Sequence, residues 1–341
     1  MSETRLMTVS ASPHLRSPKS VSRIMWLVCI SLVPVLGASV WFFGLRAAWI
    51  VLLSVGSAVG FEALTQRAFG RRITITDGSA ALTGLLLAFN LPPGVPWWLP
   101  VVGSAFAVVV AKGFFGGLGH NFVNPALAGR ALLMASWPGL MTARWLAPAG
   151  GSISGIDAVT AATPLGVLKN ASEIAGATGG PAGLLTQVQS WPVIGKLFFG
   201  QVGGCIGETS ALALLIGGLL LVVTRVVDWR IPLSYLLTVA VLVLVLPGAK
   251  AALPNYVLFH LLAGGLMLGA FFMATDYVTS PITGNGRLVF GIGCGVLTVL
   301  IRLWGGFPEG VSYAILLMNV ATPFIDRLTR PRLFGQIKAT R

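Results

Sequence analysis

Four acidic side chains lie at or near the starts of apolar runs in this sequence: Asp77, Glu208, Asp276 and Glu309. If those runs cross a membrane, the carboxylates are costly to bury, and ionisable groups at such depth commonly bind or relay a cation or a proton. One interpretation of this set is therefore a cation pathway.

The same residues also have a structural interpretation. Asp77 precedes a Gly-Ser pair and a helical run, Asp276 ends an Ala-Thr-Asp sequence, and Glu309 follows a proline. Each of these carboxylates can accept hydrogen bonds from backbone amides at a helix end. Glu208 lies inside an apolar run between glycine and threonine, so this explanation is weakest for Glu208.

A second candidate for chemistry is the polar sequence Asp157-Ala158-Val159-Thr160-Ala161-Ala162-Thr163-Pro164-Leu165. Taken alone, it is typical of a loop in which an Asp side chain caps a turn. Metal chemistry is not indicated, because Cys29, Cys205 and Cys294 lie far apart in apolar runs and form no CxxC pair. The sequence therefore predicts no metal site made by this chain alone.

The amino-acid composition indicates whether the segments that carry these side chains lie in water or in a membrane. The chain has 341 residues, of which 55% are hydrophobic and 10% charged, and its mean hydropathy is +0.86. A soluble domain carries roughly a quarter charged residues. The net charge of +13 does not indicate nucleic acid, because the basic residues form short clusters between apolar runs. We therefore expect an integral membrane protein.

We expect an all-α fold with about ten transmembrane helices, some of them short or broken, since a span needs about 20 mostly apolar residues. The predicted spans are 24–43, 47–66, 79–92, 97–112, 119–137, 197–223, 231–247, 254–273, 288–304 and 311–325. Lys and Arg concentrate in alternate loops and in both tails, which places both termini in the cytoplasm.

One polar loop, residues 138–195, divides the spans into two sets of five, and by the same count it lies outside the cytoplasm. Since five is odd, the second set enters the membrane in the opposite orientation, as in an inverted repeat. The expected domains are a cytoplasmic tail (1–23), a first five-helix repeat (24–137), the periplasmic loop (138–195), a second five-helix repeat (196–325) and a cytoplasmic basic tail (326–341).

Further motifs stand in a fixed order around this loop. They are Asp77-Gly78-Ser79-Ala80-Ala81-Leu82-Thr83-Gly84, Gly116-Gly117-Leu118-Gly119-His120-Asn121-Phe122-Val123-Asn124-Pro125-Ala126, Ala274-Thr275-Asp276-Tyr277-Val278-Thr279-Ser280-Pro281 and Pro308-Glu309-Gly310-Val311-Ser312-Tyr313-Ala314-Ile315-Leu316-Leu317-Met318-Asn319. With the loop sequence, they resemble the family formed by the D subunit of the Rnf electron-transport complex and the B subunit of the sodium-translocating NADH:quinone reductase. The resemblance covers about residues 20–335.

The resemblance implies a covalent cofactor. In that family the last Thr of an S/T-G-A-T-type motif carries FMN through a phosphoester bond that a flavin transferase installs, and the matching residue is Thr163. Asp157 and Thr160 match upstream positions that help the transferase recognise the loop. Ala161 stands where many members have Gly, which is a departure from the motif. The matching positions beside the acceptor are Ala162, Pro164 and Leu165.

The function that the resemblance implies is that of a redox subunit in an ion-translocating ferredoxin:NAD⁺ oxidoreductase of the bacterial inner membrane. Its expected partners are the lipid bilayer, the flavin transferase, and the membrane and flavin/iron–sulfur subunits of the complex. A second, noncovalent flavin, riboflavin, is compatible with the resemblance. We assign no catalytic residue to this chain and expect no activity from it alone.

Two other functions remain open at this stage. Inverted five-span repeats are common in transporters, and Asn124-Pro125-Ala126 is similar to the pore motif of water channels, which carry it twice, whereas this chain has one copy. A transporter has no use for the Thr163 motif. A purely structural membrane subunit would also leave the loop unexplained.

Overall fold

The computed structural model describes residues 20–148, 163–169, 190–246, 253–306 and 309–331. These residues form helices joined by loops, and no β-strand occurs among them. Most of the predicted periplasmic loop and most of each predicted tail lie outside the described residues. So do four residues of the loop motif, Asp157, Thr160, Ala161 and Ala162.

The first half of the chain contains seven α-helices, one 3₁₀ turn and one π-helical segment in the described range. They are α1 (Val21–Ser31), α2 (Val33–Phe43), α3 (Leu45–Ala68), η1 (Ile75–Asp77), α4 (Ser79–Phe89), α5 (Trp98–Ala105), η2 (Phe106–Gly113), α6 (Pro125–Ser136) and α7 (Pro138–Thr142).

The second half begins with a short helix over 164–169. It continues with α10 (Trp191–Phe199), α11 (Ala211–Val223), α12 (Arg230–Val245), α13 (Leu253–Leu262), α14 (Leu266–Leu268), η3 (Gly269–Met273), α15 (Gly284–Trp304) and α16 (Val311–Leu328). Every predicted span range therefore contains helix.

Fewer of these helices are long enough to cross a bilayer than the sequence predicted. Three described segments have the length and hydropathy required, Val21–Phe43, Leu45–Ala68 and Gly284–Trp304. A fourth crossing results if Pro254–Leu262 and Leu266–Met273 form one broken span, in which the chain bends by 64° between the two helices. The all-helical membrane character is supported, whereas the ten-span inverted repeat stays a prediction.

Glycines cause the largest difference from the predicted helix boundaries. The span predicted over 197–223 is interrupted, because α10 ends at Gly200 (φ +109°) and residues 201–210 are not helical before α11 begins. The span predicted over 254–273 breaks at Gly264, which has φ +69°. Glycine adopts this left-handed conformation at no steric cost, so both positions end a helix inside an apolar run.

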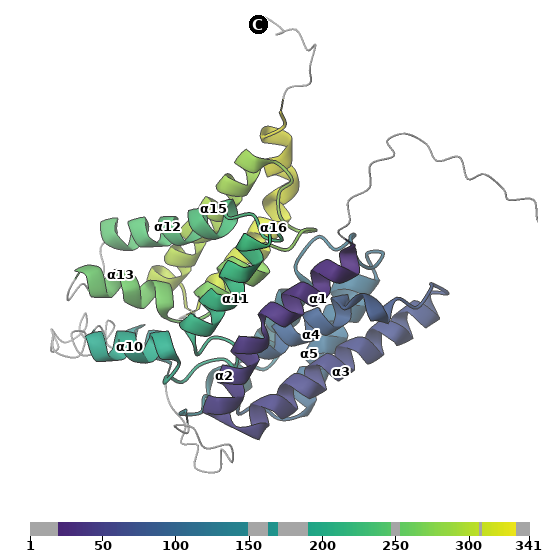
Figure 1. The fold of residues 1–341 in the computed structure, drawn as a ribbon, viewed down its shortest axis with the longest axis horizontal. Coiled ribbons are helices and arrows are strands. Elements are labelled where there is room, and N and C mark those ends of the chain that lie inside the picture. Colours follow the sequence, from purple (N-terminus) through teal and green to yellow (C-terminus); the bar gives the residue numbers. More distant parts are fainter. Residues whose placement is uncertain (1–19, 149–162, 170–189, 247–252, 307–308, 332–341) are drawn as a thin grey trace, which may run out of the picture.

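The two halves of the chain pack closely against each other. Helix α11 packs against α1 and α2 (Figure 1). Helix α16 packs against α6. The contact of α11 with the end of α1 depends on Gly217, since a Cβ atom there would overlap the backbone oxygen of Ser31. Small residues allow membrane helices to approach this closely.

We expect Gly217→Ala to destabilise the protein, because the added methyl group meets a backbone atom that cannot rotate away. Overpacking of this kind costs about 1–3 kcal/mol. Gly37→Ala in α2 is a matched control, since no atom lies within 4 Å of its Cβ position. In detergent, thermal unfolding of Gly217→Ala should begin below that of wild type, whereas Gly37→Ala should unfold at or slightly above the temperature of wild type, because alanine favours the helix. Equal unfolding temperatures for the two variants would contradict the packing argument.

Candidate functional site

Arg130 of α6 is the centre of a buried polar group, here called the arginine cluster, which also contains Asn90, Cys205, Glu208 and Glu309. The Arg130 side chain is 4% exposed. Its Nη1 lies 2.5 Å from Oδ1 of Asn90 and 3.4 Å from Oε1 of Glu208, and its Nη2 donates to Oε2 of Glu309. One guanidinium thus joins carboxylates from two segments of the second half.

The segment that carries Glu208 is held against the end of α4. The backbone amides of Ile206 and Gly207 donate to the carbonyl oxygens of Leu91 and Phe89. A Cβ atom at Gly207 would overlap the Phe89 side chain, so only glycine permits this approach. The non-helical segment 201–210 therefore places Glu208 inside the protein, where it is 5% exposed.

The break between α13 and α14 brings further groups to the arginine cluster. A Cβ atom at Gly264 would lie 2.7 Å from Cδ1 of Leu165, 3.5 Å from Nη2 of Arg302 and 3.7 Å from Cγ of Glu309. Arg302 of α15 is buried and donates to two backbone carbonyl oxygens next to the break. The break thus joins the helix over 164–169 to the arginine cluster.

Thr163 immediately precedes the helix over 164–169 and is 7% exposed. Its Oγ1 accepts a hydrogen bond of 3.2 Å from the backbone amide of Gly166. A small cavity of about 10 Å³ lies beside it, and Glu208 and Glu309 line the same cavity. The sequence-predicted residues that meet there are Thr163, Pro164, Leu165, Glu208 and Glu309.

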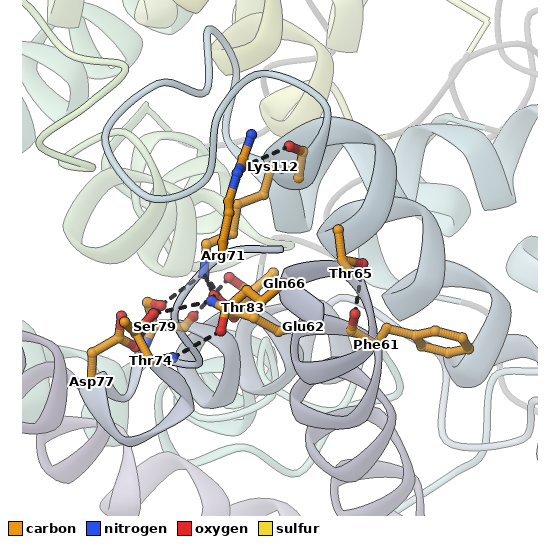
Figure 2. A network of polar contacts seen from close by, with 11 residues as sticks. Phe61, Glu62, Thr65, Gln66, Arg71, Thr74, Asp77, Ser79, Thr83 and Lys112 are labelled. Carbon is orange, nitrogen blue, oxygen red and sulfur yellow. Dashed lines mark hydrogen bonds and ion pairs between the residues drawn. The ribbon is translucent and has the colours of Figure 1, made fainter. Parts of the chain in front are cut away.

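A second buried group, here called the lysine cluster, lies where α3, α4 and η2 meet (Figure 2). Nζ of Lys112 lies 2.8 Å from both carboxylate oxygens of Glu62 and 2.7 Å from Oγ of Ser79. Asp77 accepts hydrogen bonds from the backbone amide and the hydroxyl of Ser79, the first residue of α4. The Asp77 carboxylate therefore lies at the N-terminal end of α4 and contacts its first residue.

Asp276 lies between η3 and α15 and is separate from the arginine cluster. Its Oδ2 accepts a hydrogen bond of 3.2 Å from the Thr279 hydroxyl. Asp276 and Lys112 line one cavity of about 80 Å³. The four acidic residues singled out in the sequence thus do not form a single group, because only Glu208 and Glu309 lie together.

Residues 8–335 match the NQR2, RnfD, RnfE family. The chain belongs to this family. It is 50% identical over 334 residues to the D subunit of the Na⁺-translocating ferredoxin:NAD⁺ oxidoreductase complex of Acetobacterium woodii, an alignment that covers 97% of this chain and 96% of that protein.

Two further relatives show the same near-complete coverage. The D subunit of the proton-translocating ferredoxin:NAD⁺ oxidoreductase complex of Clostridium ljungdahlii is 46% identical over 332 residues, covering 97% of this chain and 96% of that protein. The D subunit of the ion-translocating oxidoreductase complex of Stutzerimonas stutzeri is 42% identical over 345 residues, with 93% of each chain covered. The family predicted from the ordered motifs is therefore confirmed.

Sequence reasoning missed the two cations that organise the buried clusters of this family member. Arg130 lies within the predicted span 119–137, and Lys112 ends the predicted span 97–112. The structure buries both and pairs them with carboxylates. The sequence did contain a signal for these clusters, because a charged residue inside an apolar run, such as Arg130 or Glu62, usually faces the protein interior and pairs with another charge.

Metal ligation does not fit the arginine cluster of this family member. One ligand atom each from Cys205, Glu208 and Glu309 lies within 4.8 Å of the others. However, Arg130 donates to both carboxylates and brings its own positive charge to the position that a metal ion would take. A guanidinium here satisfies the same oxygens that a metal would need.

Proposed function

We propose that this chain is the D subunit of an ion-translocating ferredoxin:NAD⁺ oxidoreductase complex and passes electrons through FMN joined to Thr163 by a phosphoester bond. The assignment to this complex is supported by relatives with that name, which are 50% and 46% identical to this chain over 97% of its length. The observation that favours the cofactor is the position of Thr163, whose hydroxyl lies beside a cavity that the arginine cluster also lines.

The residues around Thr163 fit the phosphoryl end of such a group. A threonine hydroxyl can form the ester, and the Thr163 side chain borders the small cavity that Glu208 and Glu309 also line. The guanidinium of Arg302 lies next to Gly264, which lines this cavity, and supplies positive charge. The cavity is too small to enclose a three-ring flavin, so the rings would extend beyond it. When bound, the flavin would supply one- and two-electron chemistry.

The proposal includes a membrane orientation and partners. The distribution of Lys and Arg favours both termini in the cytoplasm and Thr163 on the opposite side of the bacterial inner membrane. Electrons would then reach Thr163 through other subunits of the complex, and a flavin transferase would install the cofactor. The names of the relatives include both Na⁺ and proton translocation, so we propose an ion of either kind.

We also propose that a second, noncovalent flavin, riboflavin, binds at the cavity lined by Lys112 and Asp276. Leu82, Phe271 and Phe272 provide apolar surface for a planar ring system, and Asn121 and Asn124 provide polar side chains. Ligand sites commonly combine an apolar lining with a few polar groups in this way.

The four acidic residues differ in how well they suit a cation pathway. Asp77 and Glu309 already have hydrogen-bond or ion-pair partners, and Asp276 accepts from a threonine hydroxyl. Glu208 has one carboxylate oxygen without a partner among the described residues. We therefore retain Asp77, Glu208, Asp276 and Glu309 as the proposed pathway and place Glu208 first among them.

Mass spectrometry tests the proposed cofactor directly. After co-expression with the flavin transferase, the peptide that contains Thr163 should be heavier than its sequence mass by one FMN minus water. Protein made without the transferase is the control and should give the unmodified peptide. Finding only the unmodified peptide in the assembled complex would exclude the covalent flavin and favour a transporter or a structural subunit.

A further inference from the structure

Three arginines from two separate segments of the second half line one cavity of about 500 Å³. Arg225 lies in the connection between α11 and α12, Arg230 is the first residue of α12, and Arg287 lies in the first turn of α15. The cavity has room for a group much larger than a water molecule. In the described part of the chain, its lining includes no residue of the arginine cluster or the lysine cluster, so it is a separate feature of the fold.

Glycines of α15 determine where two of these arginines meet. Helix α12 packs along α15, and Gly291 lies so close to Ser234 that a Cβ atom on the glycine would overlap the serine side chain. Small residues allow membrane helices to approach this closely. Near the start of both helices, Arg230 lies against Gly284 in the same way. This alignment fixes Arg230 and Arg287 at the same end of the helix pair.

The lining of this cavity carries more positive than negative charge. Its one carboxylate in the described residues is Asp228, whose Oδ2 lies 2.6 Å from Nη1 of Arg287 and 3.9 Å from Nη1 of Arg230. The nearby acidic residues Asp276 and Asp326 do not line the cavity. Three guanidiniums and one carboxylate give the lining a net charge of +2. Such a lining favours an anion that accepts hydrogen bonds from guanidinium groups, as phosphate oxygens do.

The surroundings of the cavity are those of a membrane–water interface. Trp229 and Tyr277 line the cavity and are about half exposed, and such aromatic side chains gather at the level of lipid headgroups. Further along α12, Leu233, Leu237 and Val241 follow one another at four-residue spacing and are also about half exposed. Residues at this spacing share one helix face. An acyl chain can lie along that face while a headgroup occupies the cavity.

We propose that this cavity binds the phosphodiester headgroup of an anionic phospholipid, such as phosphatidylglycerol. The general excess of Lys and Arg in cytoplasmic loops explains why arginines occur at this end of the helices. It does not explain why three arginines from two segments converge on one cavity. Basic pockets between membrane helices on the cytoplasmic side bind anionic headgroups in this way. The inference goes beyond the proposed electron transfer and does not depend on a flavin at Thr163.

Native mass spectrometry of the full chain in detergent, titrated with phosphatidylglycerol, tests the lipid site. Wild type should bind phosphatidylglycerol more tightly than phosphatidylcholine, whose headgroup has no net charge. Arg225→Gln combined with Arg230→Gln should weaken the affinity for phosphatidylglycerol about thirtyfold, since each arginine contributes roughly a factor of five. Arg67→Gln is the matched control, because Arg67 is an exposed arginine in the last turn of α3 and does not line the cavity. That variant should bind as wild type does.

Equal affinity for the two lipids, or unchanged affinity in the double variant, would overturn the lipid site. Displacement of the bound lipid by inorganic phosphate would overturn it in favour of a site for a free anion. Loss of the bound phosphatidylglycerol when the chain is assembled into the complex would overturn it in favour of a protein partner at this surface. If the double variant fails to fold, Arg225→Gln alone changes one exposed residue and should still weaken binding about fivefold.

Discussion

Thr163→Ala is expected to lose all flavin fluorescence in the denatured protein band after co-expression with the flavin transferase. Alanine has no hydroxyl oxygen, so the phosphoester cannot form at this position. Denaturation removes any noncovalent flavin, so the gel reports the covalent cofactor alone. The expected effect is complete, because a covalent bond is either present or absent in each molecule.

Thr163→Ser is the matched control for this loss. Serine retains the hydroxyl and lacks only the methyl group, so the fluorescence of the denatured band should remain. If Thr163→Ala fluoresces as brightly as wild type, the acceptor residue lies elsewhere. Loss of fluorescence in both variants, with normal protein levels, would show that the position needs threonine itself and not merely a hydroxyl.

The second large effect is expected at Arg130. Arg130→Met keeps an unbranched side chain but leaves Glu208 and Glu309 buried without their cation. Removing one partner of a buried ion pair costs about 3–5 kcal/mol. We therefore expect the apparent unfolding temperature in detergent to fall by on the order of 5–10 °C, as measured by thermal unfolding of the purified protein.

Two further variants separate the charge effect from a general loss of packing. Arg46→Met removes an exposed arginine that donates to the Gly94 carbonyl oxygen, and it should cost no more than about 1 kcal/mol. Arg130→Met combined with Glu309→Gln should recover part of the lost stability, because one of the two buried charges is then neutral. A double variant that is less stable than Arg130→Met would contradict the ion-pair argument.

The positions of the helices could be predicted from the sequence because local hydropathy determines which segments leave water. The helix ends were predicted less well. The apolar run over 197–223 contains no charged residue except Glu208 until its end, yet Gly200 ends α10 and residues 201–210 follow without helix. That path is fixed by contacts with Phe89 and Leu91 of the first half, which no local pattern contains.

The candidate site was predicted in part for the same reason. Thr163 and Glu309 were found because their motifs are local and ordered. The partner of Glu309 is Arg130, 179 residues away in the chain, and that of Lys112 is Glu62, 50 residues away. Such pairs follow from the tertiary packing, and one sequence taken alone carries no record of them. Lys112 stands at the end of an apolar run in the sequence, yet the fold leaves it only 3% exposed.

The close packing between the two halves also limits how an ion could move. In many carriers with inverted repeats, one half rocks against the other to expose a central site alternately to each side. Here such rocking would separate Arg130 from Glu208 and Glu309, and α11 from Ser31, in every cycle. The close contacts are better suited to a single rigid frame, in which the two halves keep their relative positions.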